Sequence, residues 1–400
     1  MTRPPLASAR VTAILAALGA VTPLSIDIAL PALPAIAKSL EADAGASQLT
    51  MGLFLVGFGL SQAYYGPLSD RYGRRPVLLA ALCLYLAASV ACIFAPSIEF
   101  LIAARFVQGA GAGAGMVLAR ACARDIHGPE MARVMSLIVT GASLAPLLAP
   151  ILGGAILAVA DWRWTFVGLA VSGVLLLGVV ALWLDESNAN KVPGAARPGP
   201  MLRNFAGLLG DRHFRGYAIV IACTYGALFA LISEISFILV GSLGASPTEV
   251  GLGFSLVMVG QISGALLSTR IAVRRGPMAM MGAGLGFMAV GSLVLIGLAI
   301  AGIATFAAII APLAVFMFGF GQSSPSIFTG ALAPYGQNAG AASSLAGVIQ
   351  WISGAAFGAA SVALHDGTAL PMGLLMIGLV AGAAVALVFL VRPQTRRAVG

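Results

Sequence analysis

Three charged residues stand inside long apolar runs of the sequence, where ionisable groups are rare and are usually functional. They are Asp27, Arg105 and Glu234, each several residues from the nearest end of its run. A carboxyl group in such a place can take up and release a proton, and a guanidinium group can compensate its negative charge. We therefore regard these three residues as candidate sites for proton coupling and substrate binding.

The apolar runs indicate a membrane protein. Of the 400 residues, 60% are hydrophobic and only 9% are charged, whereas about 25% are charged in a typical soluble domain. Runs of about 20 apolar residues are long enough to cross a bilayer as helices, and the first is too long for the apolar part of a signal peptide. We expect an all-α membrane protein with twelve transmembrane helices, within residues 11–37, 48–69, 76–97, 101–119, 134–159, 164–184, 216–241, 250–269, 277–301, 305–333, 339–364 and 369–391.

The distribution of charge predicts how the chain is organised. A polar stretch at 185–215 separates six runs from six, which predicts an N-terminal half at 1–184, a cytoplasmic linker and a C-terminal half at 216–400, with a short surface helix at 201–209. If both termini are cytoplasmic, 19 of the 22 Lys and Arg residues fall on the cytoplasmic side, as the positive-inside rule requires. The net charge of +8 therefore reflects membrane orientation rather than nucleic-acid binding.

A pattern of glycines and charges connects the second and third runs. In the stretch 66–76, Gly-Pro-Leu-Ser-Asp-Arg-Tyr-Gly-Arg-Arg-Pro, a glycine permits close helix approach, an acid can pair with arginines, and a second glycine permits a tight turn. Such an ion pair can form in one conformation and break in another, which makes the loop a candidate gate. Its residues are Gly66, Asp70, Arg71, Gly73, Arg74 and Arg75. The stretch resembles the signature loop of the major facilitator superfamily.

Other stretches resemble the Bcr/CflA family of drug:proton antiporters, the bicyclomycin and chloramphenicol resistance type. Residues 27–34 resemble its D-x-x-x-P-A-L-P segment, and 105–109 its R-F-x-Q-G segment. The fifth run resembles the antiporter motif of these exporters, with Ala149-Pro150 where the family usually has Gly-Pro. Its prolines are expected to bend the helix and its glycines to pack closely beside the bend; the residues are Gly141, Pro146, Pro150, Gly153 and Gly154.

The resemblance implies a major facilitator fold of two six-helix halves that exports small amphipathic drugs of the chloramphenicol or bicyclomycin kind across the bacterial inner membrane. Alternating access and proton entry would drive the transport. Asp27 would exchange a proton for substrate, and Arg105 would counter or modulate its charge. Two alternatives stay open: Asp27 and Arg105 form a structural ion pair, and Glu234 is a headgroup-facing or helix-end acid.

The partners expected from this interpretation are a small-molecule substrate, protons and the lipid bilayer, without nucleic acid, and the protein is expected to be monomeric and to need no cofactor or metal. An exporter of a physiological metabolite or an amino acid such as cysteine is the alternative. An intramembrane enzyme is disfavoured, because the histidines lie at loop edges and no lysine lies at membrane depth. The G-x-G-x-x-A pattern at 109–114 is expected to be a helix-packing face rather than a nucleotide site, since no strand precedes it. Candidate cavity-lining residues are Gln62, Tyr64, Tyr225, Phe237, Gln322 and Trp351.

Overall fold

The computed structural model describes residues 5–127, 131–188, 191–192, 197–336 and 339–391. Within these ranges twelve helices are long and apolar enough to cross a membrane, and no strand occurs. The expected twelve-helix, all-α membrane architecture is therefore confirmed. Residues 189–190 and 193–196 of the expected linker lie outside the described residues.

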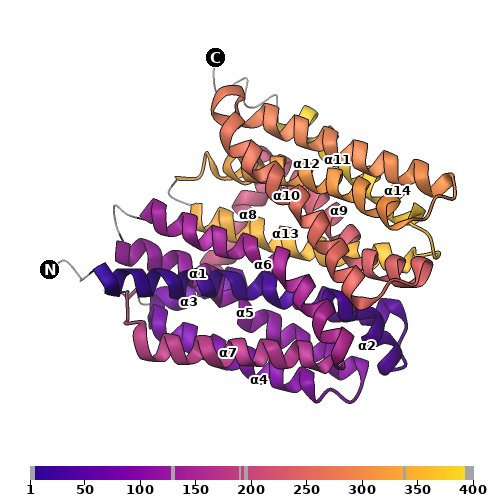
Figure 1. Cartoon of the computed structure of the whole chain (residues 1–400). Helices are drawn as coiled ribbons and strands as arrows, with labels where there is room; N and C mark the ends of the chain where they lie inside the picture. Colours follow the sequence, from indigo (N-terminus) through magenta and orange to yellow (C-terminus); the bar gives the residue numbers. More distant parts are fainter. Residues whose placement is uncertain (1–4, 128–130, 189–190, 193–196, 337–338, 392–400) are drawn as a thin grey trace. The chain divides into compact units, whose positions relative to one another are not determined.

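The chain forms two compact units, Met1–Arg197 and Pro198–Gly400, with the boundary inside the polar stretch 185–215 (Figure 1). The helices of the first unit are α1 Pro5–Asp27, η1 Leu30–Ala32, α2 Leu33–Ser39, α3 Ala44–Tyr72, α4 Arg74–Ile93, α5 Ile98–His127, α6 Met131–Val159 and α7 Arg163–Trp183. Those of the second are α8 Pro198–Gly210, α9 Arg212–Leu243, α10 Pro247–Arg275, α11 Pro277–Ile300, α12 Phe306–Leu332, α13 Ala339–Ala363, α14 Leu370–Ala386 and the π-helical turn η4 Leu387–Val391.

The first apolar run is not one continuous helix. It was expected to cross at 11–37, but α1 ends at Asp27 and the chain continues through the short η1 into α2. Pro31 and Pro34 stand in the first turns of η1 and α2, where a missing N–H is tolerated, whereas inside a longer helix each would remove a hydrogen bond. The break places Asp27 at the carboxyl end of a helix.

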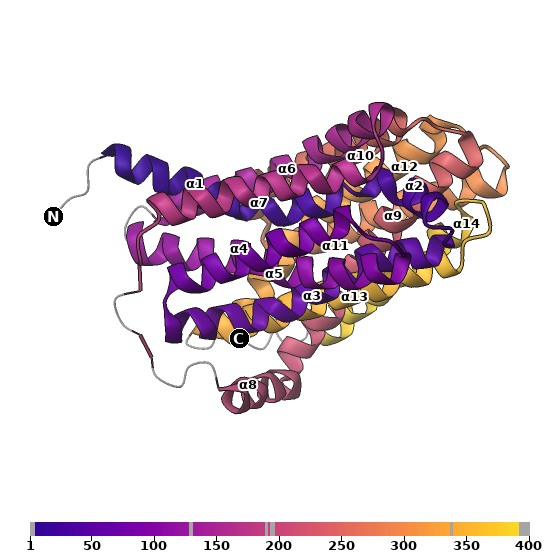
Figure 2. The ribbon, with the colours of Figure 1, turned by 90° about the horizontal axis from the view of Figure 1, so that it is seen from below.

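The surface helix expected at 201–209 is confirmed as α8. Figure 2 shows α8 at the lower edge of the view, and it contacts the spanning helices α9 and α13 of its own unit. Most of its side chains are exposed, and Leu208 is its buried anchor.

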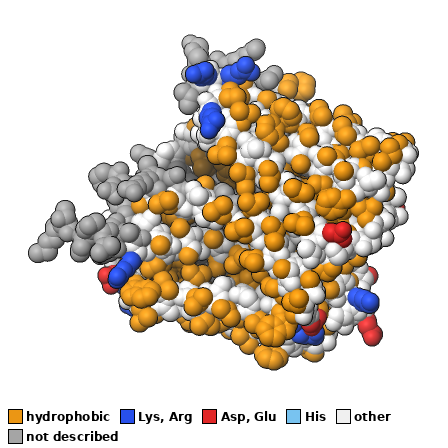
Figure 3. All heavy atoms as spheres, in the orientation of Figure 1, with side chains coloured by type: hydrophobic (Ala, Val, Ile, Leu, Met, Phe, Trp, Pro, Cys, Tyr) orange, Lys and Arg blue, Asp and Glu red, His pale blue; other side chains and the backbone are white. Residues whose placement is uncertain are grey.

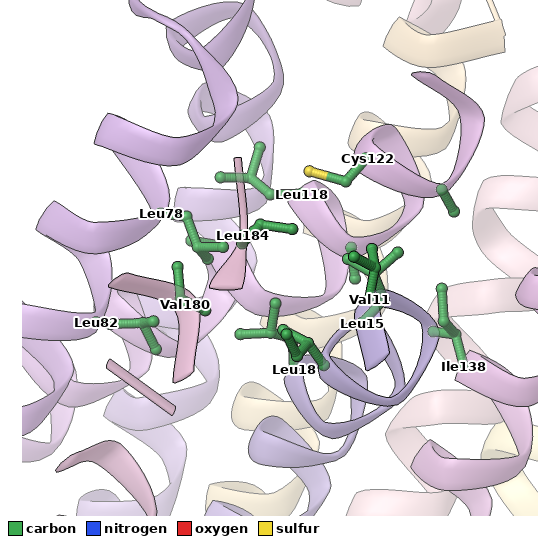
Figure 4. Packing of buried hydrophobic residues seen from close by; sticks show 14 of the residues in the cluster. Val11, Leu15, Leu18, Leu78, Leu82, Leu118, Cys122, Ile138, Val180 and Leu184 are labelled. Atoms are coloured by element: carbon green, nitrogen blue, oxygen red, sulfur yellow. The ribbon is translucent and has the colours of Figure 1, made fainter. Parts of the chain in front are cut away.

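The core of the first unit is built from apolar side chains of α1, α4, α5, α6 and α7. Leu15, Leu18, Leu78, Leu118 and Ile138 are all fully buried in this cluster and point toward one another (Figure 4). On the outside, hydrophobic side chains cover most of the visible face and few charged ones interrupt them (Figure 3). Apolar residues on both faces of the helices are what a lipid surround requires.

The small residues of α5 bring its main chain close to three neighbours. A Cβ added at Gly109 would collide with the main chain of Phe54 on α3, one at Gly111 with Tyr85 on α4, and one at Gly115 with Leu18 on α1. The packing face expected at 109–114 is therefore confirmed, and it fixes Arg105, one helical turn earlier, among the same three helices.

In the second unit α9 is the most enclosed of the spanning helices. Of its spanning window, 78% is buried, more than in any other span found in the described residues. It packs against α12, α13 and α14. Glu234 therefore lies in the interior of this unit rather than on a lipid-facing surface.

Candidate functional site

Arg105 is a buried cation whose neighbours are neutral. The residue is 1% exposed. Its Nη1 donates to Oε1 of Gln108 at 2.6 Å, and its Nη2 donates to the main-chain oxygen of Ser25 at 3.3 Å. The guanidinium carbon lies 4.2 Å from the ring centre of Phe54 and 5.6 Å from that of Phe166. Two aromatic faces and two oxygen dipoles thus replace the carboxylate that usually accompanies a buried arginine.

These contacts close into a ring of polar groups from α1, α4 and α5. Gln108 Nε2 donates to Ser89 Oγ at 2.8 Å, and Ser89 Oγ donates to the main-chain oxygen of Tyr85 at 2.7 Å. The Tyr85 hydroxyl lies 2.7 Å from Ser25 Oγ, which returns the ring to α1. Each member holds the next, so the orientation of the Arg105 side chain is fixed by three helices.

Arg105 also donates a hydrogen bond to a main-chain carbonyl group at the end of α1. The last four carbonyl groups of a helix lack intrahelical partners, and that of Ser25 is one of them in α1. Because the carboxyl end of a helix carries partial negative charge, a cation there is stabilised. The R-F-x-Q-G segment therefore contacts α1 through the main-chain oxygen of Ser25, two residues before the D-x-x-x-P-A-L-P segment begins.

Asp27 is the last residue of α1 and is buried, at 5% exposure. The structure records no hydrogen bond or ion pair for its carboxyl group within the described residues, and none to Arg105. The two groups lie in one region, because Arg105 binds the carbonyl of Ser25, two residues before Asp27. No ion pair joins Asp27 and Arg105 among the described residues, so the alternative of a purely structural ion pair is not found.

Glu234 on α9 is fully buried and strongly hydrogen-bonded. Ser361 of α13 donates its hydroxyl to Oε2, and Nδ1 of His365 lies 2.9 Å from Oε1. The headgroup-facing position considered for Glu234 is therefore wrong, because the side chain points into its own unit. Sequence reasoning missed Ser361 and His365. Their i, i+4 spacing at the end of an apolar run is the signal that points to a shared helix face.

In the candidate gating loop, Arg74 is the central residue. It is 4% exposed, and it pairs with Asp70 at 2.6 Å and with Asp125 of α5 at 3.0 Å. The predicted pairing of Asp70 with a loop arginine is confirmed. Asp125 was missed, although it is one of the few acids among the basic residues that follow the fourth run.

Residues after α7 also hold this loop. Glu186 accepts hydrogen bonds from the main-chain N–H groups of Arg74 at 2.9 Å and Arg75 at 3.2 Å, and so caps the start of α4. Gly73 has φ 108°, and a Cβ there would collide with the Glu186 carboxylate. The predicted tight turn at Gly73 is confirmed, and Glu186 is a further residue that the motif did not reveal.

Other loop residues are less enclosed. Arg71 is exposed and lies over the ring of Tyr72 at 4.8 Å. No described atom of this unit lies within 4 Å of the place that a Cβ at Gly66 would take. The close approach predicted at Gly66 is thus not made inside the first unit.

The antiporter-motif residues lie on α6, which continues as a helix through Pro146 and Pro150. A Cβ at Gly141 would lie 3.2 Å from the main-chain oxygen of Ala16 on α1, and one at Gly153 would collide with that of Ile28. The close packing predicted for these glycines is found. Gly154 is buried on the same helix. The motif therefore holds α6 against α1 on both sides of the Asp27 helix end.

The candidate cavity-lining residues of the second unit have mostly local partners. The Tyr225 hydroxyl is 3.1 Å from Ser324 Oγ, and the Trp351 ring is 5.7 Å from that of Phe229. Gln322 is buried, and its Oε1 has no hydrogen-bond partner among the described residues. Phe237 is partly buried.

In the first unit, Gln62 is partly buried and Tyr64 is 49% exposed. A groove of about 760 Å³ runs between α1 and α7. Arg10, Leu24, Ser172 and Trp183 are among its lining residues. None of the candidate cavity residues lines it, so their role stays a prediction.

Several known proteins are similar to this chain over most of its length. It matches the Major Facilitator Superfamily over residues 15–359. It is 34% identical to an uncharacterized MFS-type transporter, YdgK of Bacillus subtilis, covering 93% of this chain and 92% of that one. It is 30% identical to multidrug resistance protein D of Escherichia coli, with 89% of each chain covered. A bicyclomycin resistance protein homolog of Haemophilus influenzae is 29% identical, with 88% of each covered.

Among solved structures, the xylose transporter XylE of Escherichia coli, in a partially occluded inward-open conformation, has the same fold. The TM-score is 0.73 at 14% identity, with 95% of this chain and 96% of that one covered. The matches to the superfamily and to the drug-resistance relatives confirm the resemblance, and they support a transporter rather than an enzyme. The chain is a multi-pass membrane transporter that belongs to the Major Facilitator Superfamily.

Proposed function

We propose that this transporter exports small amphipathic drugs of the chloramphenicol or bicyclomycin kind in exchange for protons, by alternating access in the bacterial inner membrane. Relatives named for multidrug and bicyclomycin resistance support the substrate class. The excess of basic residues in alternate connecting segments supports cytoplasmic termini.

The observation that carries the proton coupling is the buried carboxyl group of Asp27, which has no ion-pair partner among the described residues and lies beside the ring of polar groups around Arg105. An ionised carboxylate in a buried site is costly unless a cation or several donors compensate it, and protonation removes that cost. A polar or cationic substrate near Asp27 compensates the ionised form instead. Substrate and proton then compete for one group, which is the simplest scheme for exchange.

Arg105 sets the electrostatic background of this competition. Its positive charge persists because the Ser25 carbonyl, Gln108 and the ring of Phe54 stabilise it without neutralising it. Since no ion pair joins it to Asp27 among the described residues, Asp27 is free to exchange partners during the cycle. A permanent ion pair would oppose that exchange.

The test is transport in proteoliposomes with an imposed pH gradient. Chloramphenicol-type drugs should be moved against their gradient when protons flow the other way, and movement should stop when the pH gradient is collapsed. Transport of an amino acid such as cysteine, with no drug transport, would replace the proposed substrate class. Drug transport that ignores the pH gradient would contradict the coupling.

A further inference from the structure

The second unit holds an acid–imidazole pair that crosses from its interior to its surface. Glu234 is 0% exposed, whereas the His365 side chain is 23% exposed. Nδ1 of His365 lies 2.9 Å from Oε1 of Glu234, and Ser361 donates to the other carboxyl oxygen. All three residues belong to α9, α13 and the segment directly after α13.

Among the described residues of the second unit, no Lys or Arg pairs with this carboxyl group. The helices packed against α9 at this level, α12, α13 and α14, contain no Asp, Glu, Lys or Arg within their bounds. Glu249 of α10 is engaged with Ser246, which it caps. Asp366 is the remaining acid nearby, and hydrogen bonds from Thr368 hold the pKa of the Asp366 carboxyl below its usual value.

The imidazole ring of His365 lies between a buried carboxyl group and the surface of the unit. On one side Nδ1 contacts the buried carboxyl group. On the other side the structure records no hydrogen-bond partner for Nε2 within the described residues, and the ring is partly exposed. An imidazole with one nitrogen on a buried acid and the other open to water is suited to pass a proton between them, because histidine titrates near neutral pH.

We propose that His365 is a proton carrier that connects Glu234 to the solution at the end of α9 and α13. Nε2 takes a proton from water, and the imidazolium passes the proton on Nδ1 to Oε1 of Glu234. The carboxyl group becomes neutral, and the imidazole is again neutral with its proton on Nε2. Reversal of both steps releases the proton, while Ser361 keeps the carboxyl group oriented throughout.

The place of His365 in the unit indicates from which side of the membrane protons reach it. This inference rests on the proposed antiport. The pair lies at the end of α9 away from Arg212 and Arg215, where the described connecting segments of the unit contain no Lys or Arg. With the basic ends in the cytoplasm, His365 faces the side from which protons enter. Glu234 would then take up an entering proton in the second unit, whereas Asp27 exchanges proton and substrate in the first.

The transport test compares His365→Gln and Ser361→Ala with the wild type across external pH 5.5 to 8. We expect His365→Gln to slow pH-driven export about a hundredfold, the low end of what a positioned acid–base group contributes, with drug affinity unchanged. Ser361→Ala should slow it less. The control is His213→Gln, since His213 lies at the opposite end of α9, against the main-chain oxygen of Gly330 at 3.0 Å. Export by His365→Gln at wild-type rates across this pH range would overturn the relay.

A second measurement does not depend on transport. The chain has three histidines, so the ¹⁵N resonances of His365 can be assigned by their loss in His365→Gln. We expect Glu234→Gln to shift the Nδ1 resonance of His365 and to leave those of His213 unchanged. An unchanged His365 spectrum would overturn the pairing. If this shift appears but the wild type shows no pH-driven transport, the antiport proposal fails while the acid–imidazole site stands.

Discussion

The two units treat a buried charge in opposite ways. In the first unit Arg105 and Asp27 lie in one region, yet the arginine binds the Ser25 carbonyl and Gln108 while no partner is recorded for the acid within the described residues. In the second unit Glu234 is bound at both oxygens by Ser361 and His365. The first arrangement holds Arg105 in place and leaves the Asp27 carboxyl group able to take a partner, whereas the second binds both oxygens of one acid and connects it to the surface.

This difference separates two roles that one acid would serve poorly. A group that must bind substrate needs unsatisfied capacity, which costs folding free energy. A group that only stores or passes a proton can be fully hydrogen-bonded. Arg74 gives a third case, since it is buried in the first unit but has Asp70 and Asp125 as carboxylate partners. Comparison of these sites defines the experiments below, from the largest expected effect to the smallest.

Asp27→Asn should abolish proton-driven export, because the amide keeps the shape of the side chain but carries no exchangeable charge. Folding should be intact, since within the described part of the chain no ion pair depends on this carboxyl group. Export rates in proteoliposomes and the melting temperature in detergent measure both. Glu41→Gln is the control, because Glu41 is an exposed acid just after the same spanning segment. Full pH-driven export by Asp27→Asn would remove Asp27 from the mechanism.

Arg105→Met should stop drug export with little loss of stability. The change leaves Gln108 and the Ser25 carbonyl without a donor, at about 1–3 kcal/mol, but it removes a buried charge whose desolvation costs several kcal/mol. We therefore expect an unfolding free energy equal to or above that of the wild type, measured by denaturation in detergent. A large loss of stability would show that Arg105 is a structural residue.

Arg74→Ala should destabilise the first unit by up to about 3–5 kcal/mol, the cost of removing one partner of a fully buried ion pair, because Arg74 is buried while Asp70 and Asp125 keep part of their exposure. Asp70 and Asp125 would then repel each other without the cation between them. Arg71→Ala is the matched control, since Arg71 is exposed in the same loop. Equal melting temperatures for the two variants would contradict the central position of Arg74.

Glu186→Gln should cost about 0.5–2 kcal/mol, in the range of a lost helix cap. The amide retains one acceptor for the N–H groups of Arg74 and Arg75 but loses the negative charge at the start of α4. Thermal denaturation alongside Arg74→Ala measures the difference. A loss as large as that of Arg74→Ala would mean that the cap, not the ion pairs, holds the loop.

Most of the fold was predictable because apolar length and charge distribution are local properties of the sequence. The twelve spans, the α8 surface helix, the turn at Gly73 and the glycine face of α5 follow from such patterns. The break after Asp27 was not predicted, although the sequence contains Pro31 and Pro34 directly after it. Hydropathy averages over a window, while a proline acts at one peptide group.

The candidate site was predictable in part. The rarity of charge in apolar runs identified Asp27, Arg105 and Glu234, but it said nothing of their partners. Those partners, among them Tyr85, Ser89 and His365, come from other helices, and which faces meet depends on packing that one sequence does not specify. The structural ion pair of Asp27 and Arg105, which the sequence left open, is not found among the described residues, where Arg105 binds the Ser25 carbonyl at the helix end instead.

The most direct measurement of the proposed exchange is proton release from the purified protein when drug is added in weakly buffered detergent solution. We predict that the wild type releases protons in proportion to bound drug, and that Asp27→Asn binds drug with little or no release. Equal release by both proteins, or drug binding to the wild type without any release, would contradict the competition of substrate and proton for Asp27.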